Sequence, residues 1–313
     1  MRTTFARTLV ELAERDSRVF LLTGDLGFSV LEPFRERFPK RFVNVGVAEQ
    51  NMLGIAAGLA HSGQVVFAYS IANFPTLRCL EQIRNDVCYH ELPVRIVSVG
   101  GGLAYGSAGY THHGVEDLAV MRALPGLSVF APGDPIETEL ITTALLDLPG
   151  PAYLRLGKAS EPAVHEARPE LVPGRAHLLQ DGSDVTVIAT GGMLFAAREA
   201  ARELAARHGL SVRLLSMHTL KPLDELSVVR AANETRLVVT CEEHSCIGGL
   251  GSAVADVLAA LPAPRARLVK FALPDRPSEV VGSQRYLLSR LGSIVERMQQ
   301  QAPELFAARA LAV

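Results

Sequence analysis

The chain has 313 residues, of which 48% are hydrophobic and 20% charged, so it can form two domains that each bury a core. Its net charge of −2 gives no electrostatic reason to expect binding to nucleic acid or to an anionic membrane. The charged N-terminal segment lacks the apolar centre of a signal peptide, and no apolar run reaches the roughly 20 residues that span a bilayer. We therefore expect a soluble cytoplasmic α/β protein. Its four cysteines have no C-x-x-C spacing and are expected to be reduced thiols of the core.

Short apolar runs alternate with helical patterns over the first 156 residues. In chain order we expect strands at 18–25, 64–70, 94–101, 127–134 and 151–156, and helices at 54–63, 77–89, 115–124 and 136–148. The strands are continuously apolar, which indicates that helices cover both faces of the sheet, as in a parallel sheet.

The composition changes after this first series. Residues 159–184 are rich in Pro, Gly and charge, which predicts a linker or a peripheral hairpin. A second series follows, with strands expected at 185–191, 211–217, 235–243 and 267–273 and helices at 194–209 and 250–261. The predicted fold is therefore two open, mostly parallel α/β domains in tandem. We place them at 1–160 and 184–313, with a linker at 161–183.

One carboxylate, Glu49, lies where a β-rich run gives way to a small-residue apolar helix. A carboxylate at a helix start can simply complement the helix dipole. However, Gly46, Gly54 and Gly58 allow close backbone approach, and a carboxylate in apolar surroundings is costly to desolvate without a partner. The second interpretation is that Glu49 awaits a nitrogen of a ligand.

Two adjacent histidines, His112 and His113, follow a Gly-rich loop and precede a predicted helix. Loops expose side chains and imidazole titrates near neutrality, so the pair is a candidate for proton transfer or ligand binding. A helix cap or surface pair is the alternative. No third ligand occurs at a useful spacing, so we predict no metal site on this chain.

Three glycine-rich segments are weaker signals. The sequence "TGDLG", 23–27, could open a metal–diphosphate loop, but no suitable Asn follows, and a strand-to-loop turn is the simpler interpretation. The segments "GGGLAYGSAG" and "GGLGS" lack the G-x-G-x-x-G order of a dinucleotide site.

Several longer segments together resemble the C-terminal half of transketolases. They are "RFVNVGVAEQNMLGIAAGLA", "YTHHGVEDLAVMRALPGLSVFAPGD", "GPAYLRLGK", "MHTLKPLD" and "CEEHSCIGGLGSAVAD". The resemblance covers nearly the whole chain and implies a pyrimidine-binding domain followed by a transketolase C-terminal domain. The diphosphate-binding domain of the family is absent from the sequence. The resemblance thus implies half of a thiamine diphosphate site, with Mg²⁺ bound mainly by a separate diphosphate-binding subunit. An α2β2 heterotetramer with self-dimerisation is the expected assembly.

The resemblance also assigns residues to the cofactor. Glu49 matches the catalytic glutamate that hydrogen-bonds the aminopyrimidine ring and favours its imino tautomer. Phe74 matches the aromatic residue that stacks on the pyrimidine, although core packing alone is an alternative. Ile71 stands where the family often has a second aromatic residue, so that wall of the pocket is expected to be aliphatic.

A second group of residues is implied to contact substrate. His112 matches a catalytic histidine that contacts substrate hydroxyls, and His113 replaces the Gln common after it. Ser29, Arg2 and Lys158 fall where the family binds the substrate phosphate. Lys158 replaces a usual arginine and binds phosphate only as a point charge. Arg2 is alternatively no more than an N-terminal charge.

Two departures from the family concern the substrate. Ala108 replaces an acidic residue that contacts the donor sugar, and Gly100 aligns approximately with a further histidine. We therefore expect transfer of a two-carbon ketol unit from a ketose, whether phosphorylated or specialised, to an aldose. A β subunit of a 2-oxoacid dehydrogenase or acetoin-cleaving enzyme is the alternative, as is a non-catalytic transketolase-like subunit. A nicotinamide-dependent oxidoreductase rests on topology alone.

Overall fold

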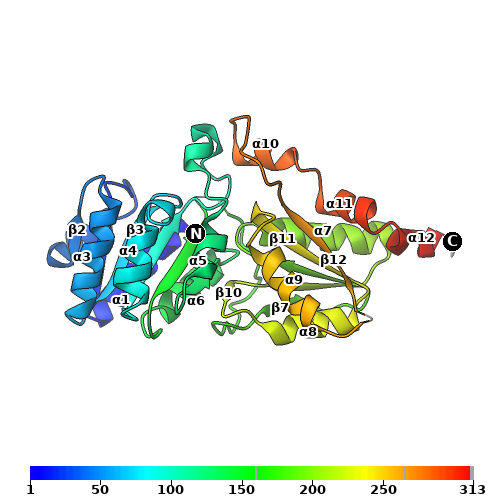
Figure 1. Cartoon of the computed structure of the whole chain (residues 1–313), viewed down its shortest axis with the longest axis horizontal. Helices are drawn as coiled ribbons and strands as arrows, with labels where there is room; N and C mark the ends of the chain where they lie inside the picture. Colours follow the sequence, from blue (N-terminus) through cyan, green and yellow to red (C-terminus); the bar gives the residue numbers. More distant parts are fainter. Residues whose placement is uncertain (159–160, 264, 311–313) are drawn as a thin grey trace.

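The chain folds into two α/β units that lie side by side along the long axis of the molecule (Figure 1). The computed structural model describes residues 1–158, 161–263 and 265–310. Residues 159–160, at the end of the predicted first domain, and 311–313, at the end of the predicted second domain, lie outside the described residues, as does residue 264. The predicted pair of mostly parallel sheets is confirmed.

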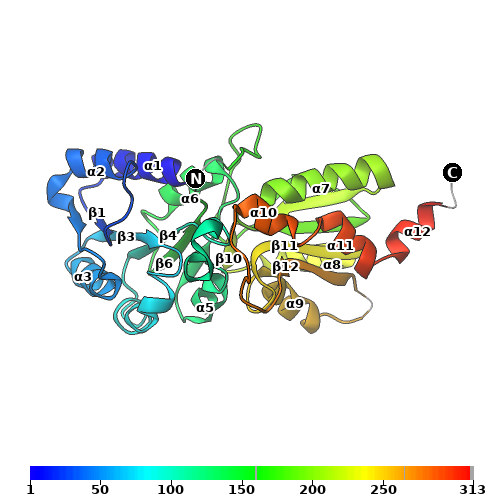
Figure 2. The same ribbon diagram turned by 90° about the horizontal axis from the view of Figure 1, so that it is seen from above.

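The first sheet has seven strands in the order β10-β5-β6-β4-β3-β1-β2, all parallel to their neighbours except β10. Its strands are β1 (Val19–Thr23), β2 (Phe42–Asn44), β3 (Val65–Ile71), β4 (Val94–Val99), β5 (Ser128–Phe130), β6 (Ala152–Leu156) and β10 (Thr219–Lys221). The helices of this unit are α1 (Arg2–Arg15), α2 (Glu32–Arg37), α3 (Glu49–His61), α4 (Leu80–Gln82), α5 (Asp117–Ala123) and α6 (Pro135–Ala144). Helices α1, α2 and α6 cover one face of the sheet, and α3 and α5 cover the other (Figure 2).

The second sheet has five strands in the order β12-β11-β8-β9-β7. Its strands are β7 (His177–Gln180), β8 (Val185–Ala189), β9 (Val212–Ser216), β11 (Leu237–Ser245) and β12 (Arg267–Leu273). The helices are α7 (Met193–His208), α8 (Glu225–Glu234), α9 (Leu250–Ala260), α10 (Gln284–Ser289), α11 (Ile294–Gln301) and α12 (Glu304–Ala310). Strand β7 lies inside the segment expected to be a linker or peripheral hairpin, and it pairs antiparallel with β9 at the sheet edge.

The two units are interlocked. Strand β10 comes from the second half of the chain, yet it pairs antiparallel with β5 of the first sheet. The ammonium of Lys221, in β10, donates a 2.9 Å hydrogen bond to the carbonyl oxygen of Arg122 and another to that of Leu124. One hydrophobic cluster also runs continuously from α3 and α5 to α8 and α9. The shared strand and shared core fix the second unit against the loops of the first.

The cysteines are free, as expected. Cys79, Cys88 and Cys241 are buried, and Cys246 is partly exposed. Burial raises the pKa of the Cys88 thiol to about 11, so this thiol stays protonated and unreactive near neutral pH. Within the part of the chain that the structure describes, no helix is long and apolar enough to cross a membrane.

Candidate active site

The carboxylate of Glu49 is buried at the first residue of α3, with a relative exposure of 1%. Its Oε2 accepts a 2.6 Å hydrogen bond from Nη1 of Arg78, which makes the contact an ion pair. Its Oε1 is held only loosely, since the hydroxyl of Ser70 in β3 donates to it at 3.4 Å. Glu49 therefore has one strong partner and one oxygen with spare capacity to accept a hydrogen bond.

The segment "TGDLG" forms one wall beside Glu49. A Cβ on Gly24 would lie 3.4 Å from both Cγ and Oε1 of Glu49, so this glycine sits directly against the carboxylate. The next residue, Asp25, donates its N–H to Oδ1 of Asn44 and accepts from the amide of the same side chain. The segment is thus a strand-to-loop turn that follows β1. Among the described residues, no cluster of three or more His, Cys, Asp or Glu side chains could hold a metal ion.

An aromatic side chain adjoins this ion pair. The guanidinium of Arg78 lies 4.6 Å from the centre of the Phe74 ring, and the ring of His112 meets Phe74 edge-on at 5.3 Å. Phe74 is only half-buried, so core packing does not use all of its surface. Ile71 closes β3 close by in the chain and is buried. The structure therefore links three of the predicted residues in one series of contacts, in which Arg78 joins Glu49 to Phe74 and Phe74 meets His112.

Tyr105 joins this group to two cationic side chains. Its ring lies 6.4 Å from the ring of His112, and Nζ of Lys158 lies 4.6 Å from the Tyr105 ring centre. Burial raises the pKa of the Tyr105 hydroxyl, and the positive charge of nearby Arg2 opposes that shift. Arg2 and Lys158, which are 156 positions apart, thus meet around one tyrosine.

The ring of Tyr105 requires a glycine at position 100. It adopts a φ of +79°, and a Cβ there would lie 2.1 Å from the Tyr105 ring. No side chain fits at this position while Tyr105 keeps its place. Tyr105 thus fills the space where a larger residue at position 100 would project.

Two predicted substrate residues lie apart from this group, and Ser29 is the first. It lies on the exposed loop before α2 with a φ of +62°, and its N–H donates to Oε1 of Glu32 at 2.9 Å. Among the described residues, no hydrogen bond joins Ser29 to Arg2 or Lys158. Its predicted role in binding phosphate stays a prediction.

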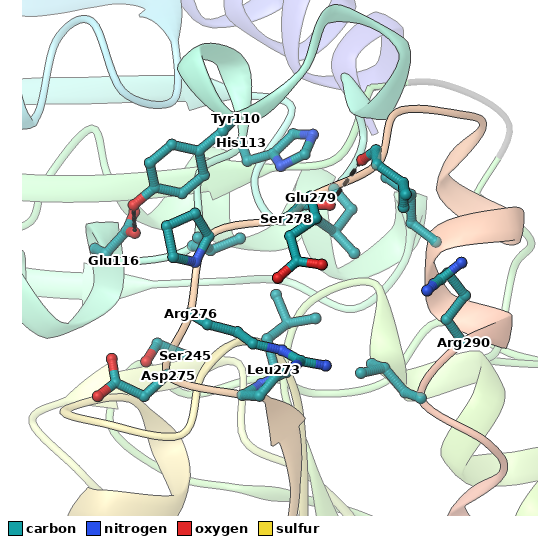
Figure 3. Close-up of a pocket in the computed structure, with 17 residues that line it drawn as sticks. Tyr110, His113, Glu116, Ser245, Leu273, Asp275, Arg276, Ser278, Glu279 and Arg290 are labelled. Atoms are coloured by element: carbon teal, nitrogen blue, oxygen red, sulfur yellow. Dashed lines mark hydrogen bonds between the residues drawn. The ribbon is translucent and has the colours of Figure 1, made fainter.

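His113 faces different surroundings from its neighbour His112. It is buried, burial lowers the pKa of its imidazole, and its Nε2 lies 3.5 Å from the carbonyl oxygen of Gly106. It lines a cavity of about 280 Å³ between the two units, together with Tyr110 and Arg276 (Figure 3). The structure therefore does not bring His113 together with Phe74, and its predicted contact with substrate stays a prediction.

Two residues of this site, Arg78 and Tyr105, were missing from the sequence prediction. Arg78 lies within a predicted helix, where an arginine normally indicates a solvated face. Tyr105 lies in a Gly-rich loop whose sequence lacks the order of a nucleotide fingerprint. The sequence feature that could have identified both as site residues is their position near Phe74 and His112 in the chain.

Comparison with known proteins identifies the family. Residues 1–162 match the transketolase pyrimidine-binding domain, and residues 174–292 match the transketolase C-terminal domain. The chain belongs to the transketolase family. It is 42% identical over 265 residues to an apulose-4-phosphate transketolase subunit of Phocaeicola vulgatus, covering 84% of this chain and 85% of that one.

Two further transketolase relatives extend this match. The chain is 37% identical to a 6-deoxy-6-sulfo-D-fructose transketolase subunit of Clostridium sp. strain MSTE9, over 97% of this chain and 94% of that one. It is 39% identical to a solved structure described as a split gene transketolase, inactive beta4 tetramer, with a TM-score of 0.87 over 97% of this chain and 98% of that one. These likenesses confirm the predicted split-transketolase subunit, a transferase that acts with a partner.

The ion pair of Glu49 and Arg78 should contribute measurably to stability. Replacing Arg78 with Met leaves the buried carboxylate without its charged partner. We expect the free energy of unfolding in urea to fall by about 1–2 kcal/mol, less than for a fully buried pair because the Arg78 side chain is 44% exposed. Adding Glu49→Gln to this variant should restore part of the loss.

The matched control is Arg84→Met, because Arg84 is exposed and, among the described residues, its side chain bonds only to its neighbour Asn85. This change should stay within about 0.5 kcal/mol of the parent chain. Equal effects of the two arginine substitutions would show that the ion pair contributes nothing.

Proposed function

We propose that this chain is the pyrimidine-domain subunit of a split, thiamine diphosphate-dependent transketolase. It would transfer a two-carbon ketol unit from a ketose to an aldose once a separate diphosphate-binding subunit completes the site. The observation that carries the proposal is the buried Glu49 carboxylate at the start of α3, beside the half-buried ring of Phe74.

The residues present suit an aminopyrimidine ring. The guanidinium of Arg78 is a planar group that donates a hydrogen bond to Glu49 and lies over Phe74. These are the two kinds of contact that a bound aminopyrimidine needs, one to a carboxylate and one to an aromatic face. Arg78 therefore acts as a stand-in for the ring, and the site accepts a flat nitrogen donor. Glu49, Phe74 and Ile71 would hold the cofactor, and Arg78 would move aside.

The chain's own residues would control protons and orientation. When bound, thiamine diphosphate supplies the carbanion and the electron sink for cleavage of the ketose carbon–carbon bond. Glu49 would hold a proton on the pyrimidine ring nitrogen and so would favour the imino tautomer. His112 has its Nδ1 3.0 Å from the hydroxyl of Thr111, which leaves its Nε2 to exchange a proton with a substrate hydroxyl.

The substrate we propose has an anionic end. Arg2 and Lys158 are cations that both lie near Tyr105. In the series of contacts, Phe74 meets His112, His112 meets Tyr105, and the two cations follow Tyr105. The apulose-4-phosphate and sulfo-fructose relatives act, by name, on a sugar phosphate and on a sulfo sugar. Tyr105 fills the space beside Gly100, and Ala108 offers no carboxylate to the sugar. A specialised ketose with a phosphate or sulfonate end fits this arrangement.

A partner subunit would cover the open side of the site. Phe28 and Val47 are large apolar side chains that remain 70% and 76% exposed, and they lie close in the chain to Gly24 and Glu49. A contiguous patch of exposed apolar side chains marks a protein–protein contact, and we propose that these two residues belong to one. We propose an α2β2 heterotetramer in the cytoplasm, with Mg²⁺ bound mainly by the diphosphate-binding subunit. The related structure described as a beta4 tetramer supports self-association of this type of subunit.

Glu49 provides the principal test of this function. In the complex with the diphosphate-binding subunit, Glu49→Gln and Glu49→Ala should lower the rate of ketol transfer by roughly 10²–10⁴-fold, because neither side chain can hold the ring proton as a carboxylate does. The rate is measured with thiamine diphosphate and Mg²⁺ present. Glu199→Gln, an exposed change on α7, is the control and should leave the rate unchanged. Full activity of the Glu49 variants would refute the assignment.

The cationic pair tests the substrate proposal separately. Lys158→Met and Arg2→Met should each raise KM for a phosphorylated ketose by about 10–100-fold, because a charged contact to the anionic end is lost. The kcat should change little, and KM for the same ketose without its phosphate should not change. Lys40→Met, at an exposed residue, is the control. An equal rise in KM for both substrates would contradict an anion-binding role.

A further inference from the structure

The loop 100–114 carries Tyr105 and His112 into the candidate active site, and it closes upon itself at its base. The N–H of Gly102 donates to the carbonyl oxygen of Gly114 at 2.7 Å, and the N–H of Gly114 donates back to Gly102 at 2.9 Å. Glycine-rich backbone has much conformational freedom, so this pair of bonds alone leaves the loop poorly fixed. Further constraints come from the first unit, where the side-chain amide of Asn73 donates to the carbonyl oxygens of Thr111 and His113. Others come from the second unit of the chain.

One buried carboxylate at the end of β11 holds the first stem of the loop. Oε1 of Glu243 accepts a 2.6 Å hydrogen bond from the N–H of Leu103. Its neighbour Gly102 has a φ of +70°, and a Cβ there would lie 2.5 Å from Cδ of Glu243. The carboxylate of Glu243 thus occupies the space that a side chain at position 102 would need. A charge-assisted hydrogen bond of this kind is stronger than a neutral one.

The same residue is tied to the second stem. Nη2 of Arg155 donates at 2.9 Å to the carbonyl oxygen of Glu243 and at 2.6 Å to that of Gly114. The amide of Gln284, the first residue of α10, donates to both carboxylate oxygens of Glu243 at 3.0 and 2.9 Å. The carboxylate of Glu243 is therefore braced from α10 and holds Leu103, while the main-chain carbonyl of the same residue is linked through Arg155 to Gly114.

Further contacts of the second unit follow the loop. The N–H of Gly282 donates to the carbonyl oxygen of Gly106 at 3.3 Å, and the N–H of Ser245 donates to that of Val115 at 2.8 Å. Figure 1 shows the helical turns of this loop beside the segment that leads into α10. The second unit thus holds the loop at both stems and near its tip.

We propose that Glu243 is a positioning residue for catalysis, through which the C-terminal domain fixes the loop 100–114 with Tyr105 and His112 in place for substrate. The role of Glu243 in catalysis rests on the proposed function. Whether Glu243 fixes the loop can be tested independently of that function. Catalytic groups must be held within a fraction of an ångström, and a glycine-rich loop reaches that precision only with outside support. A domain to which we assign no catalytic side chain thereby acquires a role in turnover.

The first measurement is hydrogen exchange of the Leu103 amide in the chain alone. Glu243→Ala removes the acceptor, and we expect this amide to exchange about 10–100-fold faster, with faster exchange throughout 100–114. Glu243→Gln keeps an acceptor oxygen for the Leu103 N–H, and a flip of the Gln284 amide restores its hydrogen bond to residue 243. Exchange of the Leu103 amide in this variant should therefore stay close to that in the parent chain. The matched control is Glu242→Gln, since Glu242 is equally buried and accepts from Leu250 and Gly251 rather than from the loop.

The second measurement is turnover in the complex with the diphosphate-binding subunit. Glu243→Ala should lower kcat/KM for the donor ketose at least 10-fold while thiamine diphosphate affinity stays within 2-fold, because Glu49 and Phe74 are not on the loop. Glu243→Gln should recover most of the turnover. Should Glu243→Ala fail to fold, Gln284→Ala removes only the brace and is expected to change exchange and turnover in the same directions.

The two readouts separate the possible failures. Unchanged exchange at Leu103 in Glu243→Ala, or in Gln284→Ala if that variant is used, overturns the inference. Faster exchange with unchanged kcat/KM overturns it too, because the loop would then be held without consequence for catalysis. Equal effects of Glu242→Gln would show a general loss of stability and also overturn it. Absence of ketol transfer in the parent complex would instead refute the proposed function, while the exchange result still decides whether Glu243 holds the loop.

Discussion

A buried carboxylate needs a partner, and the first unit of this protein is arranged around that requirement. Glu49 is almost wholly removed from water, and Arg78 reaches it from the segment that follows β3. The arginine lies over Phe74, which in turn meets His112, so one ion pair is linked through Phe74 to the loop 100–114. A carboxylate paired in this way can exchange one planar donor for another without being left buried and unpaired.

The second requirement is that the loop bearing His112 keeps its place. The two units share β10 and one hydrophobic cluster, and this interlocking gives β11 and α10 a fixed position against the loop. Glu243, Arg155 and Gln284 can then hold its stems through short bonds. The C-terminal domain thus continues the support of the candidate site, although we assign none of its residues to the cofactor.

The sequence predicted most of the sheet strands because buried parallel strands are continuously apolar. It also singled out Glu49, a carboxylate in apolar surroundings, and the structure shows that this side chain is buried. It did not predict β10, a strand of three residues whose partner lies in the other unit. Helix α1 was also missed, although Phe5, Leu9 and Leu12 follow helical spacing and are buried. The different surroundings of His112 and His113 depend on the path of the loop, which neighbouring residues in a sequence do not reveal.

Calorimetry of cofactor binding distinguishes a site divided between two subunits from a complete site on this chain. Thiamine diphosphate with Mg²⁺ is titrated into the chain alone and into the chain co-purified with its diphosphate-binding subunit. We expect saturable binding to the complex, at one cofactor per copy of this chain, and none of comparable affinity to the chain alone. Tight, metal-dependent binding to the chain alone would contradict the division of the site between two subunits.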